Sequence, residues 1–282
     1  MTAQYRQLQA VHDSQAVTDG DGVKIQRSVT RGRLQTFDPF LLLDEFRSDD
    51  AADYIGGFPE HPHRGFQTVT YMLEGRMRHR DHMGNEGVIS AGGVQWMSAG
   101  RGVLHSEMPE QDQGLLHGFQ LWINLPANEK MSEPNYQDFP ADQIPVVSLA
   151  NGATVKVIAG EFKHGAQRTR GAVVGVSTKP DYLDIHLPGQ TSIDIEVEGD
   201  KTAVVYVYEG SVDIGGRSLD SQQMGQLGNG DRVQIQSSNA ARFLLLAGQP
   251  LNEPIANWGP FVMNTQAQIE QAIEDYRHGR LV

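Results

Sequence analysis

Two short pairs of potential metal ligands stand out in the first half of the chain. His61 and His63 are separated by one proline, and His105 and Glu107 are separated by one serine. Alternate residues of a β-strand point to the same side of a sheet, so each pair would project both side chains in one direction. Three imidazoles and one carboxylate that converge from two strands can bind a divalent transition metal and leave coordination positions open. We therefore predict a metal site formed by His61, His63, His105 and Glu107.

The predicted ligands offer nitrogen and carboxylate oxygen without thiolate, because the chain contains no cysteine. Such a set suits iron(II), manganese, nickel, copper or zinc. A closed structural zinc site usually includes cysteine, so these ligands argue against a purely structural zinc. Open positions beside the metal would accept dioxygen or a chelating substrate, which favours redox or oxygenase chemistry. Taken singly, either pair is more typical of surface or half-buried side chains, and only their combination indicates a site.

Several neighbouring side chains have simpler interpretations. His79 and His82 lie in a polar segment that ends in a Gly-Asn turn, which favours a solvated hairpin over a role in a pocket. Glu60 precedes His61 and would point to the opposite face of a regular strand, so we do not expect it to be a ligand. Phe46 and Trp96 could wall a flat aromatic substrate, but core packing is the more ordinary role for each.

Composition narrows the class of partner. The chain has 282 residues, enough for two domains of ordinary size, and its formal net charge is −12. Such an acidic surface repels phosphate backbones and anionic lipids, which argues against direct binding of nucleic acid or membrane and leaves a basic protein partner open. No apolar segment has the length of a signal peptide or a membrane span, so we expect a cytoplasmic protein.

The chain consists mainly of short β segments separated by Gly, Asn and Asp. Runs rich in β-branched or aromatic residues predict strands at 68–73, 94–97, 119–125, 154–158, 203–208 and 243–246. One helix is expected at the C-terminus, where Thr265 and Gln268 fit a capping box, Ile269 and Ala272 begin an apolar stripe, and Gly279 fits a helix stop. The pattern predicts an all-β chain of sandwich or barrel type with a C-terminal helix.

An internal repeat and a proline-rich stretch predict two tandem domains. Residues 68–75 (TVTYMLEG) match residues 203–210 (AVVYVYEG), and four prolines between positions 126 and 145 mark a linker. We place the domains at 1–135 and 136–282. In the second copy the repeat lays His61 and His63 on Glu196 and Glu198, and a second short match lays His105 and Glu107 on Leu244 and Leu246. We therefore expect one metal site, in the N-terminal domain.

The sequence segments around the two ligand pairs are more specific for a protein family than the pairs themselves. The segments HPHRGF (61–66), QWMSAGRGVLHSEM (95–108) and DPFLLLDEF (38–46) resemble the pirin family. The resemblance implies a bicupin, with two tandem cupin domains and a metal held only in the N-terminal one by His61, His63, His105 and Glu107. It also implies iron as the usual metal. The broader cupin pattern has a ligating glutamate where this chain has Gln67, and pirin-like proteins use the position of Glu107 instead.

The resemblance implies two functions of different classes. One is a quercetin 2,3-dioxygenase, in which a small aromatic substrate such as a flavonol chelates the metal and dioxygen cleaves it. In that enzyme Glu107 would be the catalytic base, because it is the only acid among the four ligands. The other is a non-enzymatic regulator whose iron oxidation state changes its affinity for a protein partner. The sequence leaves both open, along with the substrate, the metal and the oligomeric state.

Overall fold

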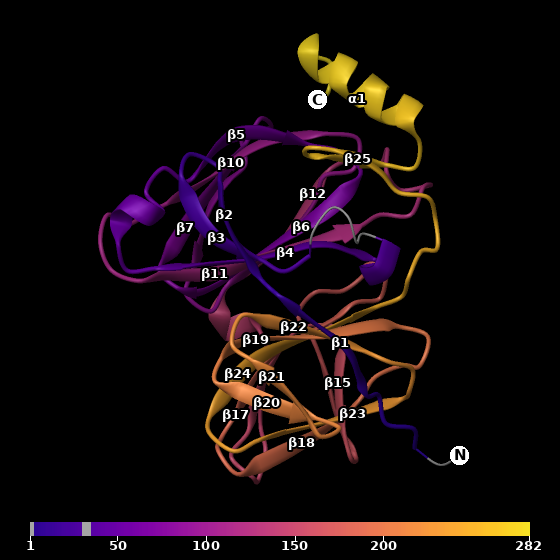
Figure 1. The fold of residues 1–282 in the computed structure, drawn as a ribbon. Helices are drawn as coiled ribbons and strands as arrows, with labels where there is room; N and C mark the ends of the chain where they lie inside the picture. The colour runs from indigo at the N-terminus through magenta and orange to yellow at the C-terminus, as the bar shows by residue number, and fades with distance from the viewer. Residues whose placement is uncertain (1–2, 30–34) are drawn as a thin grey trace. The chain divides into compact units, whose positions relative to one another are not determined.

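The computed structural model describes residues 3–29 and 35–282, and these form two compact units. The histidine unit comprises residues 15–141 and 251–282, and the second unit comprises residues 1–14 and 142–250. Nearly all regular structure in the described residues is β, with one α-helix, α1 (Gln266–Arg277) (Figure 1). No helix in this described part is long and apolar enough to cross a membrane.

The histidine unit is a β-sandwich. One sheet has seven strands in the order β12 (Asn135–Phe139), β9 (Val94–Ser98), β6 (Phe66–Glu74), β11 (Leu116–Asn124), β4 (Phe40–Ser48), β3 (Val23–Arg27) and β2 (Gln15–Asp19). The facing sheet has four strands in the order β5 (Phe58–His63), β10 (Val103–Pro109), β7 (Arg76–Asp81) and β8 (Glu86–Ser90). A buried cluster draws Met72 from the first sheet and Met77 and Ile89 from the second, which joins the two faces.

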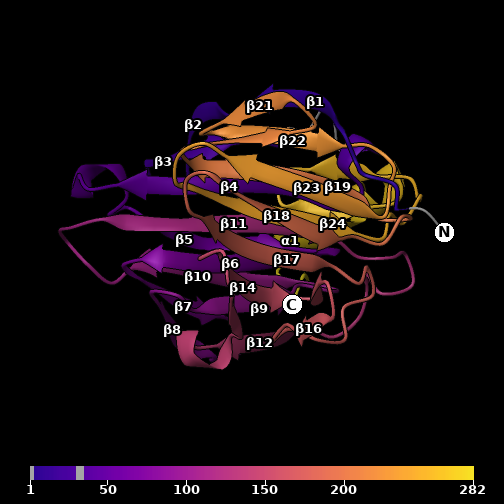
Figure 2. The same cartoon turned by 90° about the horizontal axis from the view of Figure 1, so that it is seen from below.

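The second unit repeats this plan. Its larger sheet has the order β1 (Leu8–Asp13), β22 (Gln223–Leu227), β19 (Thr202–Glu209), β24 (Ala241–Gly248), β17 (Asp181–Leu187), β14 (Thr154–Ala159) and β13 (Val146–Ser148), and Figure 2 shows β22 to β14 in succession. Its smaller sheet has the order β18 (Thr191–Glu196), β23 (Arg232–Ser237), β20 (Ser211–Ile214) and β21 (Arg217–Asp220). The remaining strands form the two hairpins β15 (Glu161–His164) with β16 (Gln167–Arg170) and β25 (Ala256–Trp258) with β26 (Phe261–Met263).

The sheet orders match strand by strand, so β6 corresponds to β19 and the strand β10 to β23. The predicted alignment of His105 and Glu107 with Leu244 and Leu246 is therefore wrong. Those leucines lie on β24, which corresponds to β11, whereas the strand that corresponds to β10 is β23. On β23 the side chains of Val233 and Ile235 are buried in an apolar core. Apolar side chains therefore occupy, in the second unit, the strand positions at which the histidine unit carries His105 and Glu107.

All six predicted strands and the predicted C-terminal helix are confirmed. Thr265 caps α1 in a capping box with Gln268, and Gly279 has a positive φ just past its end. The described elements confirm an all-β chain with two tandem sandwich domains and a C-terminal helix.

The two units differ from the predicted domains 1–135 and 136–282 at both chain ends. The strand β1 pairs with β22, so the N-terminus belongs to the second unit. The helix α1 contacts β25 and β26 in the histidine unit, as Figure 1 shows in yellow. The strand β12 pairs with β9, which moves the cut from residue 135 to residue 141. Strand pairing and helix packing over long sequence distances set these boundaries, and local composition does not encode them.

Candidate metal centre

The two predicted ligand pairs lie on neighbouring antiparallel strands. His61 and His63 end β5, His105 and Glu107 lie on β10, and His105 is directly opposite His61 in the register. The register shifts between His105 and Glu107, so Glu107 faces Phe58. Such an irregularity redirects a side chain relative to the regular strand. The structure therefore places the two predicted pairs side by side on adjacent strands of the four-stranded sheet.

The three imidazoles form one cluster. Their potential ligand nitrogens all lie within 4.8 Å of one another, and Nε2 of His61 lies 3.0 Å from Nε2 of His63. Nδ1 of His61 lies 2.8 Å from the carbonyl of Pro59, an acceptor that requires the proton on Nδ1 and leaves a lone pair on Nε2. Nε2 of His105 is buried and has no hydrogen-bond partner within residues 3–29 and 35–282. Converging lone pairs and an orphaned buried nitrogen are the arrangement that a bound cation satisfies.

Burial keeps two of these imidazoles, those of His63 and His105, in the neutral form that binds metal. His63 and His105 are almost completely buried. Burial lowers the pKa of His63 and of His105 well below 6.5, and the neighbouring imidazoles lower both further. Both side chains are therefore neutral at pH 7, and a divalent metal need not displace protons from them.

Glu107 lies on the wall of the same cavity but is not part of the cluster of three nitrogens. Its Oε1 lies 2.6 Å from Oγ1 of Thr70, and its Oε2 accepts a hydrogen bond of 3.0 Å from Nε2 of Gln120. Oγ1 of Thr70 also lies 2.7 Å from Oε1 of Gln120. Both carboxylate oxygens are thus held by side chains that the sequence alone did not indicate. That Glu107 completes a metal site stays a proposal.

His79 is the site residue that the sequence interpretation missed. It is 1% exposed, and its Nε2 lies 3.1 Å from Nδ1 of His105. The expected solvated hairpin is wrong for His79, although His82 is exposed as predicted. The signal was present in β7, where Met77, His79 and Asp81 alternate with arginines and point inward. The polar composition of the strand concealed that alternation.

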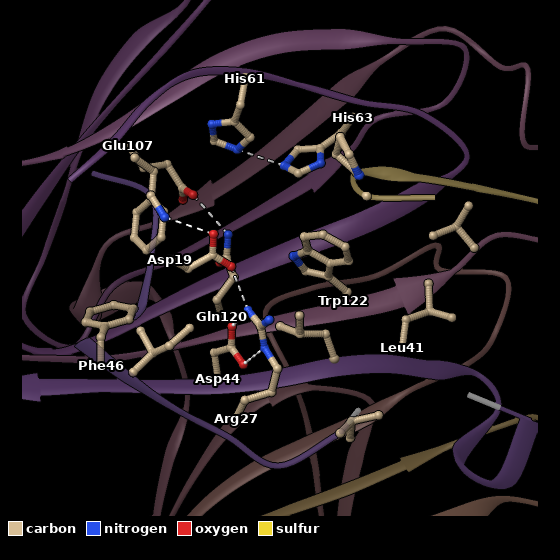
Figure 3. Close-up of a pocket in the computed structure, with 18 of the residues that line it drawn as sticks. Asp19, Arg27, Leu41, Asp44, Phe46, His61, His63, Glu107, Gln120 and Trp122 are labelled. Atoms are coloured by element: carbon tan, nitrogen blue, oxygen red, sulfur yellow. Dashed lines mark hydrogen bonds and ion pairs between the residues drawn. The ribbon is translucent and has the colours of Figure 1, made fainter. Parts of the chain in front are cut away.

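The cluster opens into a cavity of about 510 Å³. Figure 3 shows His61, His63 and Glu107 at one end, Arg27 and Asp44 at the other, and Gln120 and Trp122 between them. Apolar side chains complete the lining, among them Ile25, Leu41, Leu42, Phe46 and Phe58. Core packing is the expected role of Phe46 and Trp96, and Phe46 belongs to a buried cluster while also lining the cavity. Trp96 is buried and is not among the lining residues. The cavity combines a polar end that can bind metal with apolar walls suited to an aromatic ligand.

The C-terminal segment of the chain closes this cavity. Four of its residues line the wall, namely Asn257, Gly259, Pro260 and Val262. Nζ of Lys130 donates to the carbonyls of Gly65 and Val262 at 2.7 and 3.0 Å and to Oδ1 of Asn124 at 2.6 Å. Gly65 has a φ of 89°, and an added Cβ would lie 2.1 Å from the carbonyl oxygen of Val262, so glycine permits this approach.

Arg64, the residue directly after β5, anchors the same segment. Its guanidinium forms an ion pair of 2.7 Å with Asp275 and donates to the carbonyl of Leu281 at 3.2 Å. Arg64 is 4% exposed, so this contact is an interior one. An ion pair therefore links the residue that follows His63 directly to the helix α1.

Known proteins share both the sequence and the fold. The Pirin family model matches residues 22–123, and the model of the Pirin C-terminal cupin domain matches residues 182–282. A pirin-like protein of Caulobacter vibrioides is 51% identical over 266 residues, which cover 94% of this chain and 95% of that protein. Human pirin is 42% identical over 274 residues, which cover 95% and 91% of the two chains. The crystal structure of quercetin 2,3-dioxygenase from Acinetobacter baumannii has a TM-score of 0.90 and 35% identity and covers 99% of each chain.

Proposed function

The chain belongs to the pirin family of two-domain cupins, and from that premise we propose that it is a metal-dependent dioxygenase of the quercetin 2,3-dioxygenase type. The proposal assigns His61, His63, His105 and Glu107 to one divalent metal, with iron(II) as the first candidate and manganese, nickel, copper or zinc as alternatives. The observation that carries it is the cluster of three nitrogens within 4.8 Å at one end of a cavity of about 510 Å³. The fold shared with a quercetin 2,3-dioxygenase at 35% identity supports the reaction class.

The chemistry that the metal supplies when bound is Lewis-acid polarisation and a template for a chelating substrate and dioxygen. The protein contributes a base, because Glu107 can accept the proton of a flavonol hydroxyl at one carboxylate oxygen. Thr70 and Gln120 hold that carboxylate in place through its two oxygens. The apolar walls and Trp122 orient a flat aromatic ring and exclude water from it.

The test compares purified protein with three variants, each loaded in turn with iron(II), manganese and nickel. Bound metal, flavonol loss and oxygen uptake are measured on the same samples. His61→Ala should lose most of the metal and the turnover. Glu107→Gln should retain metal and lose at least about a hundredfold in kcat, the ordinary contribution of a positioned base. Glu60→Gln changes another acid of the same cavity and should behave as the parent protein.

The outcomes separate the two functional classes. Parallel loss of flavonol and oxygen that depends on His61 and Glu107 supports the dioxygenase. Metal binding without turnover for any of the metals would contradict it and favour a regulatory protein whose metal state controls binding to a protein partner.

A further inference from the structure

A charged cluster lies in the same cavity. Arg27 and Asp44 are at the end away from the histidines, and Asp19 lies between them and Glu107 (Figure 3). Nε and Nη2 of Arg27 donate to the two carboxylate oxygens of Asp44 at 2.9 and 2.7 Å. Nη2 of Arg27 also donates to Oδ2 of Asp19 at 2.8 Å. The three side chains come from the neighbouring strands β3, β4 and β2. We call Arg27, Asp44 and Asp19 the distal triad.

The distal triad is not an ordinary surface ion pair. The side chain of Asp44 is 8% exposed and that of Arg27 is 23% exposed, whereas that of Asp19 is 53% exposed. A buried ion pair gains little stability over apolar side chains of the same size, because both charges lose their hydration. Charged groups on the wall of a ligand cavity are better explained by recognition, where their unused hydrogen-bonding capacity meets the ligand.

Hydrogen-bonding capacity remains at this end of the cavity. Among the described residues, neither Nη1 of Arg27 nor the indole nitrogen of Trp122 makes a hydrogen bond. Both groups are donors. Asp19 supplies an acceptor beside them. Burial alone would raise the pKa of Asp19, but hydrogen bonds from Arg27 and the amide of Gly20 lower it below its usual value, so Asp19 is ionised at neutral pH.

A row of paired residues connects the distal triad to the metal end. Arg27 lies opposite Asp44, Asp44 lies opposite Gln120, and Gln120 lies opposite Thr70 in the strand registers. Gln120 in turn donates to Glu107. Polar groups therefore run along one wall of the cavity, with apolar side chains such as Leu41 and Phe46 also lining it. A flat aromatic molecule with polar groups at both ends matches this distribution.

Charge selects the kind of polar group. The distal triad contains two carboxylates and one guanidinium, so its formal charge is −1 and it does not attract an anion. A neutral hydroxyl can donate to Asp19 and accept from Arg27 at once. A carboxylate on the ligand could only accept, and it would face Asp19 at close range.

We propose that Arg27 and Asp19, supported by Asp44, form a recognition site for a hydroxyl group at the end of the substrate remote from the metal. This site would favour a chelating aromatic with a distal hydroxyl over one that carries no distal hydroxyl or carries a carboxylate there. This inference rests on the proposed function for the chelating end of the substrate.

The test measures binding without turnover. Zinc-loaded protein is titrated anaerobically with 3-hydroxyflavone, which has only the chelating hydroxyl, and with quercetin, which adds distal hydroxyls to the same chelating unit. Tryptophan fluorescence reports binding, since Trp122 lines the cavity. Quercetin should bind at least about tenfold more tightly, as expected for one hydrogen bond to a charged group. A 3-hydroxyflavone with a carboxylate in place of the distal hydroxyls should bind no more tightly than 3-hydroxyflavone itself.

Two variants identify the residues. Asp19→Asn should reduce the preference for quercetin, and Arg27→Met combined with Asp44→Leu should abolish it while the affinity for 3-hydroxyflavone stays unchanged. The pair is replaced together, because removal of one partner would leave a buried charge. Asp21→Asn is the matched control, since Asp21 lies in the turn that directly follows Asp19 and does not line the cavity.

The outcomes distinguish this inference from the proposed function. If 3-hydroxyflavone binds but quercetin gains nothing, or if the variants keep the preference, the distal site is refuted and the chelating function stands. Tighter binding of the carboxylated flavonol would also refute it. If neither flavonol binds the zinc-loaded protein, the proposed function and the distal site both fail.

Discussion

Nε2 of His79 lies 3.1 Å from Nδ1 of His105, and both imidazoles are buried. The contact occupies Nδ1 of His105, whereas its Nε2 has no hydrogen-bond partner among the described residues. A hydrogen bond to the second nitrogen of a ligating histidine fixes its tautomer and the orientation of its ring. His79 is therefore placed to orient His105.

We expect His79→Leu to weaken metal binding by about 10- to 100-fold, the usual effect of losing such a supporting contact. The reason is that His105 would lose the partner that fixes its ring while keeping its own ligand nitrogen. Competition with a chromogenic chelator measures the affinity. His186→Asn removes an exposed histidine of the second unit and serves as control. Equal affinities in the two variants would remove His79 from the site.

Thr70 gives a second prediction, because its hydroxyl lies 2.6 Å from Oε1 of Glu107. Thr70→Val keeps the shape of the side chain and removes that contact. We expect kcat for a flavonol to fall about tenfold with little change in KM or metal content, since the carboxylate loses orientation and not its charge. Thr68→Val is the control, two residues earlier on the same strand. A change in KM alone would speak against an orienting role.

The four candidate ligands could be found from the sequence because their spacing of two is a local property of a strand. Thr70, Gln120, Arg27 and Asp44 could not be found in this way. They meet only through strand registers, such as Arg27 with Asp44 and Gln120 with Thr70, and those pairs are 17 and 50 residues apart in sequence. One sequence does not specify a register between such distant strands.

The C-terminal segment illustrates the same limit at a larger scale. The capping box at Thr265 and the apolar stripe that includes Ile269 predicted the helix correctly. They gave no indication of its partner, because an amphipathic face fits many apolar surfaces. Its packing is fixed by Arg64 and Lys130, more than 100 residues earlier in the chain, through contacts with Asp275 and Val262.

Lys130 leads to a prediction about stability. Its buried ammonium donates to three oxygens, on Gly65, Asn124 and Val262. Lys130→Met would leave these acceptors without a partner, and we expect the free energy of unfolding to fall by roughly 2 to 4 kcal/mol. Lys24→Met is the control, because Lys24 is an exposed lysine whose ion pair with Asp53 is screened by solvent.

Urea denaturation followed by tryptophan fluorescence measures the change in the free energy of unfolding of the histidine unit. All three tryptophans, at positions 96, 122 and 258, belong to the histidine unit. The signal therefore reports the unfolding of that unit alone. Equal midpoints for the two lysine variants would show that Lys130 does not support the closure of the cavity by the C-terminal segment.

The buried imidazoles predict how stability depends on pH in the metal-free protein. Burial lowers the pKa of His63 and His105 well below 6.5, so both stay neutral in the folded chain while the unfolded chain binds protons near pH 6.5. Between these pKa values the unfolded state holds more protons, so the free energy of unfolding falls as the pH falls. Each such histidine contributes a slope of about 1.4 kcal/mol per pH unit below pH 6.5.

Asp44 opposes this trend at lower pH. Burial raises its pKa to about 6, so below that value the folded chain binds a proton that the unfolded carboxyl does not yet hold. The net slope should therefore level off near about 1.4 kcal/mol per pH unit below pH 6, where the proton bound by Asp44 in the folded chain offsets one of the two imidazoles. Urea titrations at pH 7, 6.5, 6 and 5 measure the slope. His63→Leu should remove the contribution of one imidazole and leave a slope near zero below pH 6. A slope unchanged by this substitution would mean that His63 is protonated alike in both states.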